Sequence, residues 1–368
     1  MGILNLLLFT AAIAVNAQQA ALTEDSRCGC YLLKGNDTTY FSKHRFFDFR
    51  NHDHHATVPP VIAEVKDTPN APVTSPFFNS TDWTDFWMIS NWNNSHGTRQ
   101  DSSLLMVNSP NNVYLEANPS PTNPSPKSWL SLRTQRLPEF QTAAEIESLS
   151  AKFKFVSLRM LARTIGAQGA ITAMFTYRHS EEYSQVQESD LEIRTSDPKN
   201  LIHCTNQPSL NSSGDVEARA SKNATMPDGL EWSDWAVHRL DWTPGRTTWY
   251  VDEVEVARIE FQTPREVSNV ILNAWSDGGE WTGDMEVGGS AYLQVQWFEI
   301  LYNTTEKLEE ERQGREEGEG VCHSVCSVDG TPEVGRPVML WSNGVGRGLG
   351  VFGGWVPVVM VTVLFLLA

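Results

Sequence analysis

The sequence predicts an all-β protein folded as a two-sheet sandwich or jelly roll. Residues 152–156 and 249–252 alternate apolar and polar side chains with period two, and the second run follows the turn Pro244-Gly245. Residues 292–300 continue this alternation over a longer stretch. No long segment has a helical period, and short strands separated by turn residues are typical of sandwiches and barrels.

Composition limits the classes of function. The chain has 368 residues, of which 40% are hydrophobic, so it can bury a sizeable core. The formal net charge of −17 argues against nucleic acid as a partner and against electrostatic binding to a membrane surface. The 13 Trp residues exceed what core filling needs, and some of them are expected to form a flat stacking surface for a ligand.

The first residues predict a secretory signal peptide. Residues 3–15 are apolar, and Val15-Asn16-Ala17 is a small-residue cleavage pattern, so residues 1–17 are expected to be removed after Ala17. This run is shorter than the roughly 20 residues that a membrane span needs.

The last residues predict a glycosylphosphatidylinositol (GPI) anchor signal. Residues 355–368 are apolar and carry no basic residue, and they follow the small triplet Ser342-Asn343-Gly344 and a glycine-rich spacer. Ser342 or Asn343 is the expected attachment site, and residues 343–368 form the propeptide. A short transmembrane tail is the alternative.

Between these signals the chain divides into three parts. Residues 18–75 are expected to pack on the sandwich as an N-terminal segment, and residues 76–303 are expected to form the jelly roll itself. Residues 304–342 form an acidic linker with a cysteine pair, in which residues 306–319 are rich in Glu.

The sequence favours a disulfide-bonded glycoprotein. Outside the cell its cysteines are expected mostly to form disulfides that join the two ends of the domain, with one of the five left over. The pairing stays open. The cysteines are Cys28, Cys30, Cys204, Cys322 and Cys326, and the six N-glycosylation sequons begin at Asn36, Asn79, Asn93, Asn211, Asn223 and Asn303.

Three carboxylates in residues 187–193 carry the strongest chemical signal. On a strand, Glu188, Asp190 and Glu192 share one face, and Leu191 and Ile193 share the other. A solvated acidic strand is one interpretation. The other is glycoside cleavage, which needs an ionised carboxylate to attack the anomeric carbon and a protonated one to donate to the leaving oxygen.

Four segments in order resemble glycoside hydrolase family 16. Residues 169–177 followed by Glu188-x-Asp190-x-Glu192 are similar to its catalytic strand pair. Residues 241–252 (DWTPGRTTWYVD) are similar to its hairpin, with Glu253 where Gly is usual, and residues 271–283 are similar to its LNxW…GGxWxG segment. This resemblance covers about residues 150–302 and, more weakly, extends back to about residue 75.

The resemblance implies a concanavalin A-like β-jelly roll with an open cleft. It implies that Glu188 is the nucleophile, Asp190 the assisting carboxylate and Glu192 the general acid/base of a retaining mechanism. The continuation Ile193-Arg194-Thr195 departs from the lichenase and wall-crosslinking groups, so the substrate subgroup stays open.

Aromatic and histidine residues give further candidates. Trp275, Trp281 and Tyr177 are the expected sugar-stacking residues, with a place in the core as the alternative for each. Trp83, Trp87 and Trp92 are expected to pack in the core, with a distal sugar-binding subsite as the alternative. The four histidines His44, His52, His54 and His55 lack the spacing of a zinc site. The family often carries a structural calcium, but no ligands for one are marked here, and no other cofactor is expected.

Together these features predict a secreted, GPI-anchored retaining enzyme of the fungal cell-surface type. Its expected partner is cell-wall β-glucan, which it is expected to cleave within the chain, as an endo-β-glucanase, at β-1,3 or β-1,3/1,4 linkages. Its expected membrane contact is through the anchor lipid alone. Hydrolysis and transglycosylation are both open. The alternative is a catalytically silent glycan-binding or structural wall protein on the same fold.

Overall fold

The computed structural model describes residues 21–33, 39–94, 101–122, 125–211, 213–305 and 322–342. The predicted signal peptide, the sequon at Asn36, the Glu-rich run and the anchor propeptide lie outside these residues. Strands dominate the described chain, and this confirms the all-β prediction.

The strands are β1 (Cys30–Leu33), β2 (Thr39–Phe41), β3 (Lys43–Asp48), β4 (Trp87–Ile89), β5 (Met106–Asn108), β6 (Val113–Ala117), β7 (Ser128–Arg136), β8 (Gln141–Ser148), β9 (Phe153–Gly166), β10 (Ile171–Arg178), β11 (Gln187–Arg194), β12 (Leu201–Gln207), β13 (Ser221–Thr225), β14 (Ala236–Thr243), β15 (Arg246–Val251), β16 (Val254–Ile259), β17 (Asn269–Trp275), β18 (Ser290–Thr304), β19 (Ser324–Ser327) and β20 (Val338–Ser342). The helices are the short α1 (Thr81–Thr84) and the 3-10 turns η1 (Asp25–Arg27), η2 (Asp53–His55), η3 (Val65–Asn70), η4 (Pro76–Asn79), η5 (Pro110–Asn112), η6 (Tyr183–Gln185) and η7 (Pro227–Gly229).

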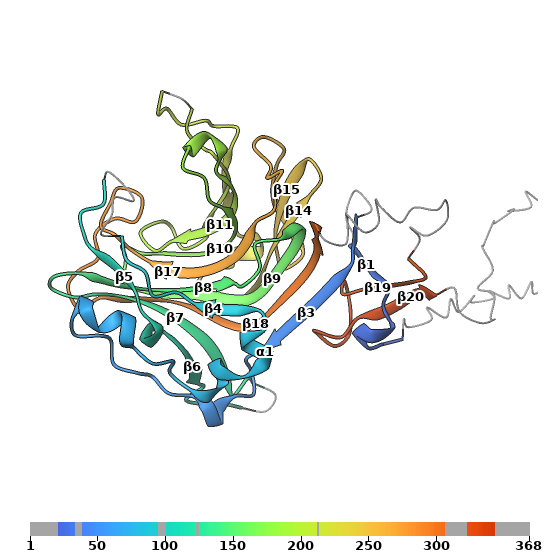
Figure 1. The fold of residues 1–368 in the computed structure, drawn as a ribbon, viewed down its shortest axis with the longest axis horizontal. Coiled ribbons are helices and arrows are strands. Elements are labelled where there is room, and N and C mark those ends of the chain that lie inside the picture. The colour runs from blue at the N-terminus through green and yellow to red at the C-terminus, as the bar shows by residue number, and fades with distance from the viewer. Residues whose placement is uncertain are drawn as a thin grey trace, which may run out of the picture.

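One large curved sheet forms the body of the protein (Figure 1). Its strands run in the order β13-β12-β11-β10-β17-β8-β7-β18-β9-β14-β15-β16, with β3 on β18, β6 on β7, and β4 and β5 on β8. The sheet turns over where β8 meets β7, so β13 to β8 form one layer and β7 to β16 form the other. Neighbouring strands in this order are antiparallel, as expected for a sandwich built from hairpins.

The hydrophobic core lies between the two layers. Leu191 and Met174 enter it from the first layer, and Leu158, Trp242 and Trp249 enter it from the second. Each of these side chains is at most 1% exposed. Because the strand period is two, the residues that alternate with Leu191 and Met174 must point out of the other face of the first layer. That outer face carries the candidate site.

A two-residue turn explains how Glu253 replaces a glycine. Val251 pairs with Val254, so Asp252 and Glu253 are the central residues of the hairpin between β15 and β16. Both have positive φ, +46° and +65°, a conformation that favours glycine. The Glu253 side chain forms an ion pair of 2.8 Å with Arg239.

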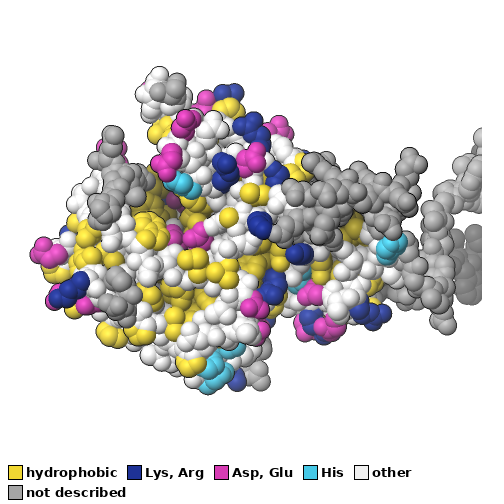
Figure 2. All heavy atoms as spheres, viewed as in Figure 1, with side chains coloured by type: hydrophobic (Ala, Val, Ile, Leu, Met, Phe, Trp, Pro, Cys, Tyr) yellow, Lys and Arg dark blue, Asp and Glu magenta, His cyan; other side chains and the backbone are white. Residues whose placement is uncertain are grey.

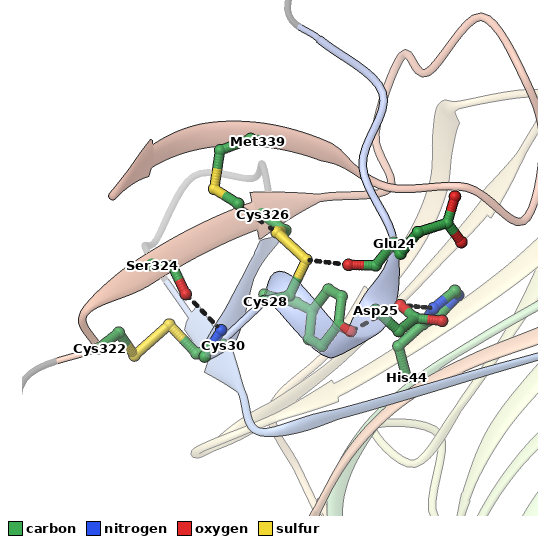
Figure 3. The surroundings of a disulfide bond; sticks show 11 residues. Glu24, Asp25, Cys28, Cys30, His44, Cys322, Ser324, Cys326 and Met339 are labelled. Carbon is green, nitrogen blue, oxygen red and sulfur yellow. Dashed lines mark hydrogen bonds and ion pairs between the residues drawn. A yellow bond between two sulfur atoms is a disulfide. The ribbon is translucent and has the colours of Figure 1, made fainter. Parts of the chain in front are cut away.

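The two ends of the domain are joined by a small sheet and two disulfides (Figure 3). β1 pairs with β2 and with β19, and β19 pairs with β20. Cys28 bonds to Cys326 and Cys30 bonds to Cys322. This confirms that cysteines join the two ends, and the leftover thiol is Cys204, which is buried opposite Leu191.

A buried charge cluster attaches this small sheet to the sandwich. Asp329 follows β19, and its carboxylate lies 2.6 Å from Arg159 of β9 and 3.6 Å from Arg239 of β14. Arg239 also forms a buried ion pair of 2.7 Å with Asp241. Removing one partner of such a buried pair leaves a charge without compensation, so these contacts hold the C-terminal strands on the second layer.

His44 provides a second attachment between the N-terminal segment and the sandwich. One ring nitrogen lies 2.8 Å from Asp25, as Figure 3 shows, and the other lies 3.1 Å from Glu299, 255 positions along the chain. Burial alone lowers the pKa of His44, but the hydrogen bonds to Asp25 and Glu299 raise it to about 9. The folded protein therefore holds this ring protonated near neutral pH.

We expect the free energy of unfolding to fall between pH 6.5 and 9 because of His44. A folded pKa raised above the unfolded value stabilises the fold below the unfolded pKa, and this contribution is lost as pH rises through the folded pKa. The loss should be on the order of 3 kcal/mol. Urea unfolding of the wild type and of His44→Gln at pH 6 and pH 9 measures it. An equal pH dependence in both proteins would contradict this role of His44.

Candidate active site

β11 presents three carboxylates on the outer face of the first layer. Ser189 and Leu191 are buried toward the core, and Ser189 donates a hydrogen bond of 2.6 Å to Asn206. Glu188, Asp190 and Glu192 alternate with them and therefore point the other way, into one cleft of about 710 Å³. The spacing predicted this shared face, and the tertiary structure makes it the wall of a cleft.

The cleft crosses several strands of the first layer. Figure 2 shows acidic and hydrophobic side chains together in the hollowed middle of this face. By strand register, Gln207, Thr205 and His203 of β12 lie opposite the three carboxylates, one to each. Its lining consists of Asp101, Tyr183, Glu188, Asp190, Glu192, Arg194, His203, Thr205, Gln207, Ser209, Leu210, Val216, Ser221, Asn223, Trp275 and Trp281.

The electrostatics of the carboxylates favour the sharing of protons. Burial raises the pKa of Glu188 to about 7, and the charge of Glu192 adds to this rise, while a hydrogen bond from Asp190 lowers it. Burial, followed by the charges of Glu188 and Glu192, raises the pKa of Asp190 well above its usual range. Asp190 therefore keeps its proton and donates it in a hydrogen bond to Glu188. Gln207 donates a second, long hydrogen bond of 3.5 Å to Asp190.

Trp281 lies beside Glu192 in a cage of polar side chains. Its indole N–H donates to a Glu192 oxygen at 3.4 Å. The guanidinium of Arg194 covers the indole at 4.5 Å, and the ring of His203 meets it nearly at right angles at 5.1 Å. Asp197 contacts both partners, lying 2.5 Å from His203 and 3.8 Å from Arg194. This cage fixes where the indole N–H points.

The other two predicted stacking residues differ in whether they line the cleft. Trp275 lines the cleft and also a second cavity of about 160 Å³, which Trp92 and Glu145 share. Trp92 donates a hydrogen bond of 2.8 Å to Glu145, and burial raises the pKa of Glu145. Tyr177 lies opposite Glu188 on β10 and on the same sheet face, but it is not among the side chains that line the cleft.

Of the remaining tryptophans, Trp83 and Trp87 are buried in the core, at 1% and 2% exposure, whereas Trp92 is 42% exposed. The favoured core interpretation therefore holds for the first two. Trp92 instead forms part of the second cavity, beside Trp275.

Sequence reasoning missed several residues of the cleft. His203, Thr205 and Gln207 occupy alternate positions of the strand that follows the acidic one, and this period of two was the available signal. Asp197 had no comparable signal, because its contacts with His203 and Arg194 arise from the turn between β11 and β12. Asp101 reaches the cleft from a distant loop by accepting a hydrogen bond of 2.9 Å from the Glu280 amide.

The described residues contain neither a cluster of metal-ligating side chains nor a helix able to span a membrane. No group of three or more His, Cys, Asp or Glu side chains there is arranged to hold a metal ion. The rings of His54 and His55 in the histidine run contact each other, with centroids 4.1 Å apart and planes tilted by 43°. Within the same ranges, no helix has both the length and the apolar character that crossing a membrane requires.

Solved structures with similar chains include three glucanases. The β-glucanase of Bacillus licheniformis is 18% identical, with a TM-score of 0.46 over 60% of this chain and 94% of that one. The endo-β-1,3-glucanase of Pyrococcus furiosus is 17% identical, with a TM-score of 0.47 over 60% and 89%. A prokaryotic β-1,3-1,4-glucanase (lichenase) from a mouse hindgut metagenome is 16% identical, with a TM-score of 0.47 over 71% and 99%.

No curated protein sequence matches the chain. The model of the glycosyl hydrolases family 16 matches residues 87–298. These residues make up more than half of the chain and contain β11 with its three carboxylates. This protein therefore belongs to glycosyl hydrolases family 16.

Proposed function

We propose that this protein is a retaining glycosidase that acts on β-glucan chains with β-1,3 or β-1,3/1,4 linkages. The observation that carries the proposal is the placement of Glu188, Asp190 and Glu192 on one strand face within one cleft. Family membership supports glycoside cleavage as the reaction. The sugar-stacking side of the site would be provided by Trp275.

In the first step, Glu188 attacks the anomeric carbon while Glu192 donates its proton to the glycosidic oxygen. The carbon–oxygen bond to the leaving sugar breaks, and a covalent glycosyl ester forms on Glu188. The proton on Asp190 is hydrogen-bonded to Glu188 and stabilises its charge before the attack.

In the second step, Glu192 removes a proton from the incoming nucleophile, which attacks the same carbon and releases Glu188. Two inversions restore the original configuration. Water as the nucleophile gives hydrolysis, and a sugar hydroxyl gives transglycosylation. The predicted signal peptide and anchor signal support a place at the cell surface, where cell-wall glucan would be the substrate.

Mass spectrometry of products tests this function. The full chain is incubated in heavy-oxygen water with β-1,3-linked and mixed-linkage oligosaccharides. Shorter, heavy-labelled products would establish hydrolysis, and unlabelled products longer than the donor would establish transglycosylation. Binding of these oligosaccharides without any turnover would support the silent glycan-binding alternative instead.

We expect Trp281→Phe to lower kcat by roughly tenfold, the value of one hydrogen bond to a charged group, and to change KM little. The variant keeps an aromatic ring but loses the N–H that contacts Glu192. Substrates with a nitrophenolate leaving group need little protonation, so kcat on these substrates should fall less. Trp341→Phe on β20 is the matched control. An equal loss on both kinds of substrate would mean that Trp281 does not act through Glu192.

A further inference from the structure

One glycosylation sequon lies on the wall of the cleft. Asn223 belongs to β13, the edge strand of the first layer. It pairs with His203 of β12, which in turn pairs with Glu192. Two strand spacings separate it from Glu192, which is about 10 Å. Asn223 also lines the cleft, on the side away from Trp275.

The side chain of Asn223 is available for modification. It is exposed, as is Thr225, the hydroxyl residue of its sequon, and no hydrogen bond engages its amide within the described residues. Other sequons differ. Asn303 donates to Tyr40 at 3.1 Å and accepts from Ser42 at 2.8 Å, so its amide is held on both sides.

An apolar rim lies along the same side of the cleft as Asn223, past Gln207 at the far end of β12. Tyr183, Leu210 and Val216 are 45%, 41% and 75% exposed, and all three line the cleft near the end of β12, where Leu210 bridges Val216 and Tyr183 donates a hydrogen bond to Gln207. Exposed apolar side chains grouped in this way are unusual in a soluble protein, and a covering carbohydrate would remove them from water. Asn79, on η4, is an exposed sequon that lines none of the cavities described above.

We propose that Asn223 carries an N-linked glycan that covers this rim and closes the β12–β13 end of the cleft. The oligosaccharide comes from a lipid-diphosphate donor. The bond from its anomeric carbon to the diphosphate oxygen breaks, a bond to the Asn223 amide nitrogen forms, and the amide proton leaves with the lipid diphosphate. This proposal rests on the proposed function and on the predicted secretory route.

The glycan limits how far a glucan chain extends past the carboxylates. The Trp275 end and the second cavity stay open, so short oligosaccharides still bind across Glu188 and Glu192. A long polymer must also pass over β12 and β13, where the glycan lies. Glycosylation therefore selects against cleavage in the middle of long chains and favours cleavage near an end.

The test uses the full chain secreted from a eukaryotic host. Thr225→Ala removes the sequon without touching the cleft lining, and Thr225→Ser keeps it. Thr81→Ala, which removes the sequon at Asn79, is the matched control. Peptide mass spectrometry should find glycan on Asn223 in the wild type and in Thr225→Ser. An unmodified Asn223 beside a modified Asn79 would overturn the proposal.

Two measurements test what the glycan does to the cleft. We expect Thr225→Ala to raise kcat/KM on polymeric glucan at least about fivefold, close to 1 kcal/mol, and to leave it unchanged on a tetrasaccharide. Hydroxyl-radical labelling of Tyr183, Leu210 and Val216 should rise at least about twofold in the same variant, because the covering carbohydrate is lost.

The labelling does not depend on activity, so it separates the two proposals. Inactivity of every variant, with increased labelling in Thr225→Ala, would overturn the proposed function and keep the glycan in the cleft. Equal labelling in a fully glycosylated wild type and in Thr225→Ala would overturn the inference, whatever the activity.

Discussion

Replacing Glu188 by Gln should lower kcat by roughly four orders of magnitude or more, as expected when a nucleophile is removed. The amide cannot attack the anomeric carbon, so no glycosyl ester forms. The protein should still fold and bind oligosaccharide, because Gln has nearly the same shape and still accepts the hydrogen bond from Asp190. Hydrolysis rates on a β-1,3-linked oligosaccharide, together with the affinity of the variant for it, provide the measurement.

The same variant should be more stable than the wild type above neutral pH. Burial raises the pKa of Glu188 in the folded state to about 7, so the folded protein disfavours the ionised form that the reaction needs. The contribution of this group to stability is present at low pH and is lost as pH rises through the folded pKa. Gln carries no charge, so urea unfolding at pH 8 should give a higher free energy of unfolding for Glu188→Gln than for the wild type.

Glu181→Gln is the matched control for this experiment. Glu181 lies on the loop between β10 and β11, its side chain is 96% exposed, and the chemical change is the same. It should alter neither activity nor stability measurably. If Glu188→Gln retained more than about a hundredth of wild-type kcat, far above the residual activity expected without a nucleophile, another group would have to be the nucleophile.

Replacing Glu192 by Gln should lower kcat in a way that depends on the leaving group. Loss of a general acid costs about 10²–10⁴-fold for a sugar leaving group, which must be protonated. A nitrophenyl glycoside leaves without that proton, so its glycosyl ester forms but accumulates, because no base activates water. A burst of nitrophenolate followed by slow turnover is the expected time course.

Azide should restore turnover of the nitrophenyl substrate in Glu192→Gln. Azide is already a nucleophile and needs no base, so it attacks the glycosyl ester on Glu188 directly. The product should be the β-glycosyl azide, with the configuration of the substrate, because two inversions occur. Nuclear magnetic resonance of the product decides this point. An α-glycosyl azide, or no rescue on any substrate, would contradict the assigned role.

Local sequence was enough to predict the sandwich and the shared face of the three carboxylates. The strand period alone sends Glu188, Asp190 and Glu192 one way and Leu191 the other, and no distant residue is needed for that. The hairpin of β14 and β15 was equally readable from its turn, Pro244-Gly245, because a turn and the strands beside it are encoded by adjacent residues.

The tertiary structure decided which residues surround the carboxylates. Trp281 reaches Glu192 across 89 positions in the chain, and its orientation depends on Asp197 through His203 and Arg194. No spacing rule connects these segments, because strand pairing and loop packing bring them together only in the folded chain. For the same reason sequence predicted Trp281 as a stacking surface, whereas the structure covers one of its faces with Arg194.

The sequence also shows which cysteines and sequons the chain contains, but not where they lie in the fold. Only folding pairs Cys28 with Cys326 and leaves Cys204 in the core. Only folding places Asn223 two strands away from Glu192 and places Asn79 on a distant turn. Residue type and spacing determined what chemistry this chain can perform. The register of antiparallel strands determined where the carboxylates and their neighbours lie in the cleft. Register depends on contacts between residues far apart in the sequence, so the sequence pattern alone does not show it.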